Sequence, residues 1–138
     1  MMAMKRLLLL LMEVALVLAG HQGGNFIPGA PVNISTDDAG LQQAVLNATY
    51  LYNNQSNDAF LFKPSAVVRA QRQIVKGFKY LVDFQISRTV CRKRDAHADL
   101  SRCDFQPKGL LHQTIQCHFE VWLIPWENVA EQVLSCKS

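Results

Sequence analysis

The chain has 138 residues, of which 49% are hydrophobic and 18% charged, and its formal net charge is +3. This length suits one domain with a single hydrophobic core, and so small a charge gives no reason to expect nucleic acid as a partner. The one basic cluster, Arg92-Lys93-Arg94, has no interleaved aromatic residues. We therefore expect a solvated loop there and not a stacking platform for single strands.

The N-terminus has the pattern of a secretory signal peptide. Lys5 and Arg6 precede an apolar run over residues 7–18, and small residues follow it at Ala19 and Gly20. The run is short for a bilayer span, and Glu13 within it argues against a permanent anchor. The alternative, an amphipathic helix on a membrane surface, is less favoured because no charged face recurs. We predict a signal peptide over 1–20 and a secreted mature domain over 21–138 with no membrane partner.

The mature domain is expected to begin with a flexible arm and one helix. Residues 21–34 contain glycine, proline, asparagine and isolated apolar residues in no regular order. This composition predicts a flexible, extended arm. Residues 35–38 then offer oxygens for a helix N-cap, and their acidic pair suits the positive end of the helix dipole. Beyond them a three- and four-residue spacing predicts one amphipathic helix, ended by the polar stretch 53–58. Its buried stripe comprises Leu41, Ala44, Val45, Ala48, Leu51 and Tyr52, and Gln42, Gln43, Asn47 and Asn53 are expected to face away.

After this helix the pattern changes to strands. From Phe60 onward aromatic and β-branched residues recur at alternate positions, interrupted by a charged loop over 92–107. Period two with these residue types predicts antiparallel strands joined by hairpins, the last a short one around 132–136. Pro64 is expected to mark a bulge or an edge. The order of elements predicts an α+β domain, in which one amphipathic helix packs across a four- to five-stranded antiparallel sheet.

All four cysteines, Cys91, Cys103, Cys117 and Cys136, lie in the C-terminal half of the chain. A signal peptide would deliver them to an oxidising compartment, so two disulfides are expected. Three connectivities are possible, and the sequence alone does not choose among them. The sequential pattern would close two loops of modest size, each stabilising the fold by roughly 3 kcal/mol.

Metal and thiol chemistry are both disfavoured. No Cys-x-x-Cys pair occurs, and His112 and His118 lack the spacing typical of zinc ligands. A thiol hydrolase that used one of these histidines as its base would need a free cysteine, which an even count in an oxidising compartment does not leave. We therefore expect no metal, no cofactor and no catalytic residue.

Two breaks between predicted strands stand out. Gln73-Ile74-Val75-Lys76-Gly77 ends in a glycine that can adopt the positive φ of a tight hairpin. Pro125-Trp126 places a large aromatic residue at another break, where exposure is unfavourable unless a partner covers it. Together the two breaks indicate a binding edge and not a catalytic pocket.

These two motifs, together with Gly29 and the four C-terminal cysteines, resemble the type 2 (secreted) cystatins, inhibitors of papain-like cysteine proteases such as the cathepsins. The resemblance covers essentially the whole mature chain. It implies the cystatin fold and a three-part wedge that enters the protease groove without bonding to the thiol, so that inhibition is competitive, reversible and tight. The protease-binding residues that it implies are Ile27, Pro28 and Gly29 in the unprimed subsites, Gln73, Ile74, Val75, Lys76 and Gly77 at the centre, and Pro125 and Trp126 on the primed side.

The resemblance also implies a second inhibitory site. Ser56-Asn57-Asp58, just after the predicted helix, matches the motif by which some cystatins inhibit legumain, an asparagine-specific protease. The alternative is a plain helix-ending turn, in which Asn and Asp are favoured anyway. Three glycosylation sequons begin at Asn33, Asn47 and Asn54.

Within the family, residues 60–63, 73–77, 103–106 and 120–122 look most like an endolysosomal leukocyte branch. Members of that branch carry two extra cysteines that make an inactive covalent dimer. This chain has no spare cysteine, and Gln55 stands where one of them is expected. We therefore predict a monomer that is active without reduction. Because sugars carry the lysosomal sorting signal in that branch, delivery to endosomes and lysosomes is expected beside secretion.

A non-inhibitory protein with the same fold, such as a cathelicidin precursor, is the remaining alternative. Those precursors carry a cationic peptide after the last cysteine, whereas only Lys137 and Ser138 follow Cys136 here. The intact Gln-x-Val-x-Gly motif also disfavours this alternative.

Overall fold

The computed structural model describes residues 29–95 and 99–138, and residues 31–138 form one compact unit. The predicted signal peptide over 1–20 and the arm residues Ile27 and Pro28 lie outside the described residues. Within the described part of the chain, no helix has both the length and the apolar content needed to cross a bilayer.

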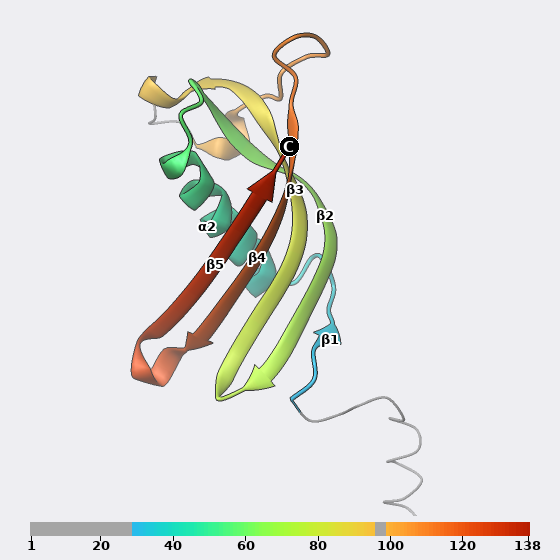
Figure 1. The fold of residues 1–138 in the computed structure, drawn as a ribbon, viewed down its shortest axis with the longest axis vertical. Coiled ribbons are helices and arrows are strands. Elements are labelled where there is room, and N and C mark those ends of the chain that lie inside the picture. The colour runs from blue at the N-terminus through green and yellow to red at the C-terminus, as the bar shows by residue number, and fades with distance from the viewer. Residues whose placement is uncertain (1–28, 96–98) are drawn as a thin grey trace, which may run out of the picture. The chain divides into compact units, whose positions relative to one another are not determined.

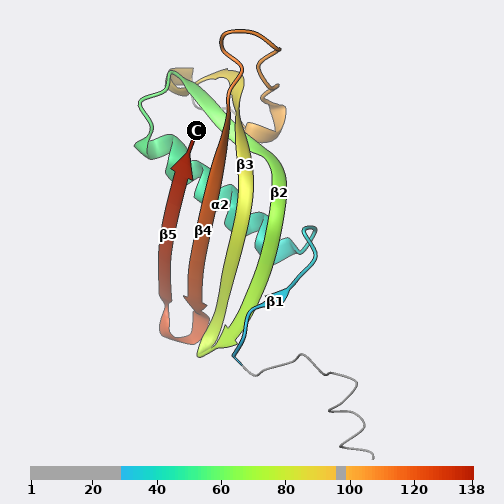
Figure 2. The ribbon, with the colours of Figure 1, turned by 45° about the vertical axis from the view of Figure 1, so that its right-hand side comes forward.

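The predicted amphipathic helix is present as α2 (Ala39–Gln55). Asp38 caps its N-terminus, and its side chain accepts a hydrogen bond from the Leu41 amide at 3.0 Å. The helix lies across one face of the sheet (Figures 1 and 2), so its apolar stripe becomes part of the core. The buried residues of the helix are Leu41, Ala44, Val45, Ala48, Thr49 and Asn53.

Asn53 corrects the prediction that it faces away from the sheet. Its side chain is almost fully buried, with a residue exposure of 3%. The amide group donates to the Phe62 carbonyl and accepts from the Phe62 N–H, each at 2.9 Å. Because both polar atoms have partners, Asn53 joins the last turn of the helix to the first strand of the hairpin at little cost of burial.

The sheet has five antiparallel strands whose spatial order follows the chain order. Its strands are β1 (Val32–Asn33), β2 (Phe60–Val75), β3 (Gly77–Arg92), β4 (Thr114–Ile124) and β5 (Val129–Lys137). The longest strands, β2 and β3, are strongly curved (Figure 1), and their register shifts between Pro64 and Ala66. This irregularity confirms the predicted bulge at Pro64, whose missing N–H cannot serve a regular ladder.

The first strand corrects the prediction of an arm without regular structure over residues 21–34. Val32 and Asn33 pair with Arg72 and Gln71 of β2, and the Ile34 amide donates to the Ala70 carbonyl at 3.1 Å. Two residues are too few for a period-two pattern to appear, so only the exposed edge of β2 specifies this strand.

The core lies between α2 and the sheet. Alternate residues of β3 and β4 point toward the helix, and neighbours across the register such as Phe84 and Cys117 therefore share this face. Tyr52 of the helix meets Phe62 edge to face, with ring centroids 5.3 Å apart. The fully buried side chains of greatest volume are Phe62, Phe84, Phe119, Leu41 and Ile86.

Both disulfides follow the sequential pattern, Cys91 with Cys103 and Cys117 with Cys136. The first fastens the loop after β3, which contains the short helices η1 (Lys93–Asp95) and η2 (Leu100–Arg102), to a small second cluster of buried side chains around Leu61 and Leu100. The second joins the two final strands. All four cysteines are consumed, so the chain has no thiol for a catalytic role.

Candidate functional site

The two predicted hairpins lie at the same end of the sheet. Lys76 alone connects β2 to β3, and the short helix η3 (Pro125–Glu127) connects β4 to β5. Since Phe78 pairs with Leu123, the start of β3 lies directly beside the end of β4. Figures 1 and 2 show both turns at the lower end of the sheet. We refer to residues 73–77 and 125–126 together as the hairpin edge.

Gly77 holds the two hairpins close together. Its φ is +79°, and a Cβ added there would lie 2.1 Å from the Leu123 carbonyl oxygen and 3.1 Å from the Ile124 Cα. Two features therefore require glycine at this position: the left-handed backbone and the close approach of β4. The second hairpin also contains a left-handed residue, Asn128, at φ 52°.

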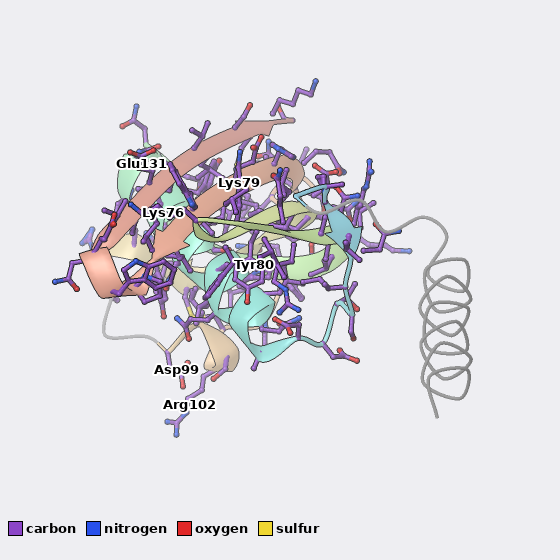
Figure 3. All side chains as sticks on the ribbon, turned by 90° about the horizontal axis from the view of Figure 1, so that it is seen from below. Lys76, Lys79, Tyr80, Asp99, Arg102 and Glu131 are labelled. Carbon is purple, nitrogen blue, oxygen red and sulfur yellow. A yellow bond between two sulfur atoms is a disulfide. The ribbon has the colours of Figure 1, made fainter. Side chains whose placement is uncertain are left out.

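Two side-chain contacts bridge the hairpins. The Trp122 indole Nε1 of β4 donates to the Lys76 carbonyl at 2.7 Å, and Lys76 Nζ lies 2.5 Å from Glu127 Oε1. Figure 3 looks at the sheet from this end and labels Lys76 and Lys79, with Tyr80 between the sheet and the helix. Neither Trp122 nor Glu127 could be assigned this bridging role from the sequence, because the role depends on which strands become neighbours.

The hairpin edge exposes apolar side chains to solvent. Trp126 is 67% exposed and Ile74 65%, and Val75 is 38% exposed. Gln73 is partly buried, whereas Lys76 and Pro125 are exposed. A projecting apolar edge that rests on a sheet is suited to enter a groove on a partner.

The third part of the implied wedge is only partly within the described residues. Gly29 has a φ of +84°, which favours glycine, and a Cβ added there would meet no atom within 4 Å. Ile27 and Pro28 lie outside the described residues. The β1 pairing does show that Val32 is opposite Arg72, so the chain preceding β1 starts from the hairpin end of the sheet.

The Ser56-Asn57-Asp58 segment lies at the opposite end of the sheet, between α2 and the start of β2. Asn57 is exposed, whereas hydrogen bonds hold its neighbours Ser56 and Asp58 in place. The Ser56 hydroxyl accepts from the Asp58 amide at 3.0 Å, and the Asp58 carboxylate accepts from the Phe60 amide at 2.9 Å. Lys93 Nζ donates to the Ser56 carbonyl. The loop thus presents one side chain from a braced backbone.

Arg88 is the centre of this bracing. Its guanidinium forms an ion pair with Asp58 at 2.5 Å and donates to the Leu111 carbonyl at 2.7 Å and to Gln113 Oε1 at 2.8 Å. Burial of the Asp58 carboxyl opposes ionisation, but the hydrogen bonds from Arg88 and the Phe60 amide outweigh it and hold the pKa of Asp58 below its usual value. One arginine of β3 therefore fixes two loops that are distant in sequence.

The predicted glycosylation positions Asn33, Asn47 and Asn54 are all exposed. Asn47 lies on the solvent face of α2, as expected, where its side-chain oxygen accepts from Gln43 Nε2 at 2.9 Å. Asn54 is in the last turn of α2, three positions before Asn57.

His118 lies between two carboxylates, one on β3 and one on its own strand, β4. Its Nδ1 lies 2.5 Å from Asp83 Oδ1 and its Nε2 lies 2.9 Å from Glu120 Oε2. The hydrogen bond to Asp83, followed by that to Glu120, raises the pKa of His118 above its usual value. Within the described ranges no group of three or more His, Cys, Asp or Glu side chains could hold a metal ion.

Known proteins share this fold and these motifs. The cystatin domain family matches residues 29–126. Human Cystatin-F is 46% identical over 110 residues, which cover 79% of this chain and 75% of that protein, and mouse Cystatin-F is 44% identical over 111 residues, covering 80% and 76%. The crystal structure of dimeric human cystatin F superposes with a TM-score of 0.70 at 45% identity, covering 82% of this chain and 90% of that one. The chain therefore belongs to the cystatin family, whose members inhibit cysteine proteases and are not enzymes.

Proposed function

We propose that this protein is a reversible, tight-binding, competitive inhibitor of papain-like cysteine proteases, the cathepsins, and that the hairpin edge is the surface that enters their active-site groove. The observation that carries this proposal is the pair of exposed apolar hairpins, Gln73–Gly77 and Pro125-Trp126, held side by side at one end of a rigid sheet. A surface that is rigid before binding loses little ordering entropy on contact. Trp126 supplies a large flat anchor of the kind that dominates interface energies.

The N-terminal arm completes the proposed contact. Ile27, Pro28 and Gly29 would occupy the unprimed side of the groove, because β1 begins at the hairpin end and the chain before it continues from there. Gly29 would allow close backbone approach to the enzyme. Proline at position 28, where stronger cathepsin inhibitors of the family carry an aliphatic residue, would reduce affinity for some cathepsins.

The proposal is tested by inhibition of papain and cathepsin L, followed with a fluorogenic substrate. Replacing Trp126 with alanine should raise the inhibition constant by about 30-fold or more, the factor that corresponds to an anchor of about 2 kcal/mol. Val133→Ala is the matched control, since Val133 is 66% exposed on β5 and outside the hairpin edge. Deleting the chain through Gly29 should also weaken inhibition. Unchanged potency of both the Trp126 variant and the deletion would contradict the proposal, and activity that returns on dilution would establish reversibility.

We further propose that Asn57 serves a second, independent inhibitory site directed at legumain. The braced loop that presents an exposed Asn57 supports this role, since a protease specific for asparagine requires that side chain to protrude. The loop and the hairpin edge lie at opposite ends of the long β2 strand, so neither site should interfere with the other. Asn57→Ala should abolish inhibition of legumain and leave the papain inhibition constant unchanged. Equal loss against both enzymes would contradict two separate sites.

The disulfides and the exposed sequons bear on the assembly and the location of the protein. We propose a monomer that needs no reductive activation, because both disulfides are internal and no cysteine remains for a covalent dimer. We also propose that the protein is secreted and reaches endosomes and lysosomes through glycans at the exposed Asn33, Asn47 or Asn54. Sedimentation under oxidising and reducing conditions tests the first point. Lysosomal uptake before and after deglycosylation tests the second.

A further inference from the structure

We infer that Trp122 is a positioning residue for protease inhibition: it sets the place of the first hairpin relative to the second without itself contacting the protease. This inference rests on the proposed function of the hairpin edge. The observation behind it is the hydrogen bond from the Trp122 indole Nε1 to the Lys76 carbonyl, at 2.7 Å, between residues 46 positions apart.

The acceptor of this bond lies in the turn of the first hairpin. Lys76 is the single residue between β2 and β3, and its carbonyl belongs to the turn and not to the regular ladder. Two-stranded ribbons twist more than wide sheets, so strand pairing alone does not fix the direction of the turn. A directed bond to the carbonyl of this residue therefore restrains the whole tip, which carries the exposed Ile74 and Val75.

The donor, in contrast, is fixed by the sheet. Trp122 pairs with Lys79 of β3 and Glu131 of β5, so strands on both sides hold its backbone. It lies three residues before Pro125, in the strand that leads directly into the second hairpin. The bond therefore ties the first hairpin to β4, and β4 in turn determines where the second hairpin lies.

Two further contacts act on the same turn, but neither replaces the indole bond. The Lys76–Glu127 ion pair is exposed, with side-chain exposures of 60% and 39%, and such pairs contribute little in water. The close approach of Gly77 to Leu123 limits the distance between the hairpins but does not direct the carbonyl. Among these contacts, only the indole bond is both directed and anchored in a strand with a partner strand on each side.

The test replaces Trp122 with phenylalanine, which keeps an aromatic ring and removes the donor. The inhibition constant for papain should rise by about three- to tenfold, the factor equivalent to one ordinary hydrogen bond. In the free protein, hydrogen exchange of the amides of residues 75–77 should become faster, because the tip opens more often. Glu131→Gln is the matched control: Glu131 is the neighbour of Trp122 on β5, and this change should alter neither measurement.

A double-mutant comparison separates positioning from direct contact. In a Val75→Ala background the effect of Trp122→Phe should shrink, because the restrained tip has fewer contacts to lose. In a Trp126→Ala background the effect should shrink as well, since the indole bond places the first hairpin relative to the second. Full effects in both backgrounds, with unchanged amide exchange, would mean that Trp122 contacts the protease directly and would overturn the inference.

The result for the unmodified protein distinguishes the two levels of the proposal. If the unmodified protein inhibits papain and Trp122→Phe is equally potent, this inference fails and the proposed function stands. If the unmodified protein does not inhibit papain or cathepsin L, the proposed function and this inference fail together.

Discussion

The two ends of the long β2–β3 hairpin use different physical means to present a loop. At the hairpin edge, Gly77 brings two backbones together, and the side chains that project, such as Trp126, are apolar. At the other end, the loop around Asn57 is held by charges and hydrogen bonds centred on Arg88. The first arrangement offers an apolar edge that can fill a groove, whereas the second offers one polar side chain. The two ends should therefore respond to different substitutions.

The largest effect is expected from Gly77→Ala, which breaks the hairpin end. The added Cβ would overlap the Leu123 carbonyl, and the positive φ would be strained, so we expect a loss of about 2–4 kcal/mol in the free energy of unfolding and a severe loss of papain inhibition. Urea denaturation measures the first quantity. Gly109→Ala is the control, because Gly109 also has a positive φ, +148°, but open space around it. Equal losses in the two variants would show that backbone strain, and not the contact with β4, dominates at Gly77.

Asn53→Ala should destabilise the end of the sheet that carries the Asn57 loop. It leaves the N–H and the carbonyl of Phe62 buried without their partners, and we expect a loss of about 2–3 kcal/mol in unfolding free energy. Legumain inhibition should weaken more than papain inhibition, because the adjoining loop loses its support. The exposed neighbour Gln55, changed to alanine, should leave stability within about 0.5 kcal/mol. A comparable loss in both variants would contradict the role assigned to Asn53.

Asp58→Asn tests whether charge stabilises the Asn57 loop, because the contribution of Asp58 to stability depends on pH. The folded-state pKa of Asp58 lies below its unfolded value, so its ionised form contributes stability that is present above pH about 4 and is lost as the pH falls through the folded-state pKa. We expect the variant to be less stable by about 1 kcal/mol at neutral pH and to approach the unmodified protein in strong acid. Denaturation curves at pH 7 and pH 3 measure this difference. A difference that grows in acid would reverse the assigned sign.

The smallest effect is expected between the two ends, at His118→Gln. The folded-state pKa of His118 is raised, so its imidazolium stabilises the fold below pH about 6.5, and this contribution is lost as the pH rises through the folded-state pKa. Because its side chain is 42% exposed, screening leaves only a few tenths of a kcal/mol. Thermal unfolding at pH 5 and pH 8, in low and high salt, should show a difference only in acid at low salt. A larger difference at pH 8 would exclude the imidazolium as its cause.

Much of the fold could be predicted because strong local patterns specify it. The helix spacing from Leu41 onward, the alternation around Phe84 and the glycine of the first hairpin each leave a signature within a few residues. The sequence left three possible cysteine pairings, and the structure shows the sequential one. The burial of Asn53 was predicted wrongly, since a polar residue near a helix end ordinarily faces solvent.

In the candidate site, too, some residues could be predicted from the sequence and others could not. Gln73, Val75 and Trp126 could be singled out because turn chemistry and exposed aromatic residues are visible in the sequence. Trp122 and Arg88 could not, because each acts on a residue more than 20 positions away and its role exists only once the strands are neighbours.

By itself, the sequence determined the local elements of this protein, the places where they turn, and the membership of its motifs in one family. Only the tertiary structure decided which turns share an end of the sheet, which carbonyl the Trp122 indole meets, and which polar side chains are buried with partners. The physical reason is that periodicity and turn preference act between near neighbours in the chain, whereas the register of paired strands sets the contacts between distant ones.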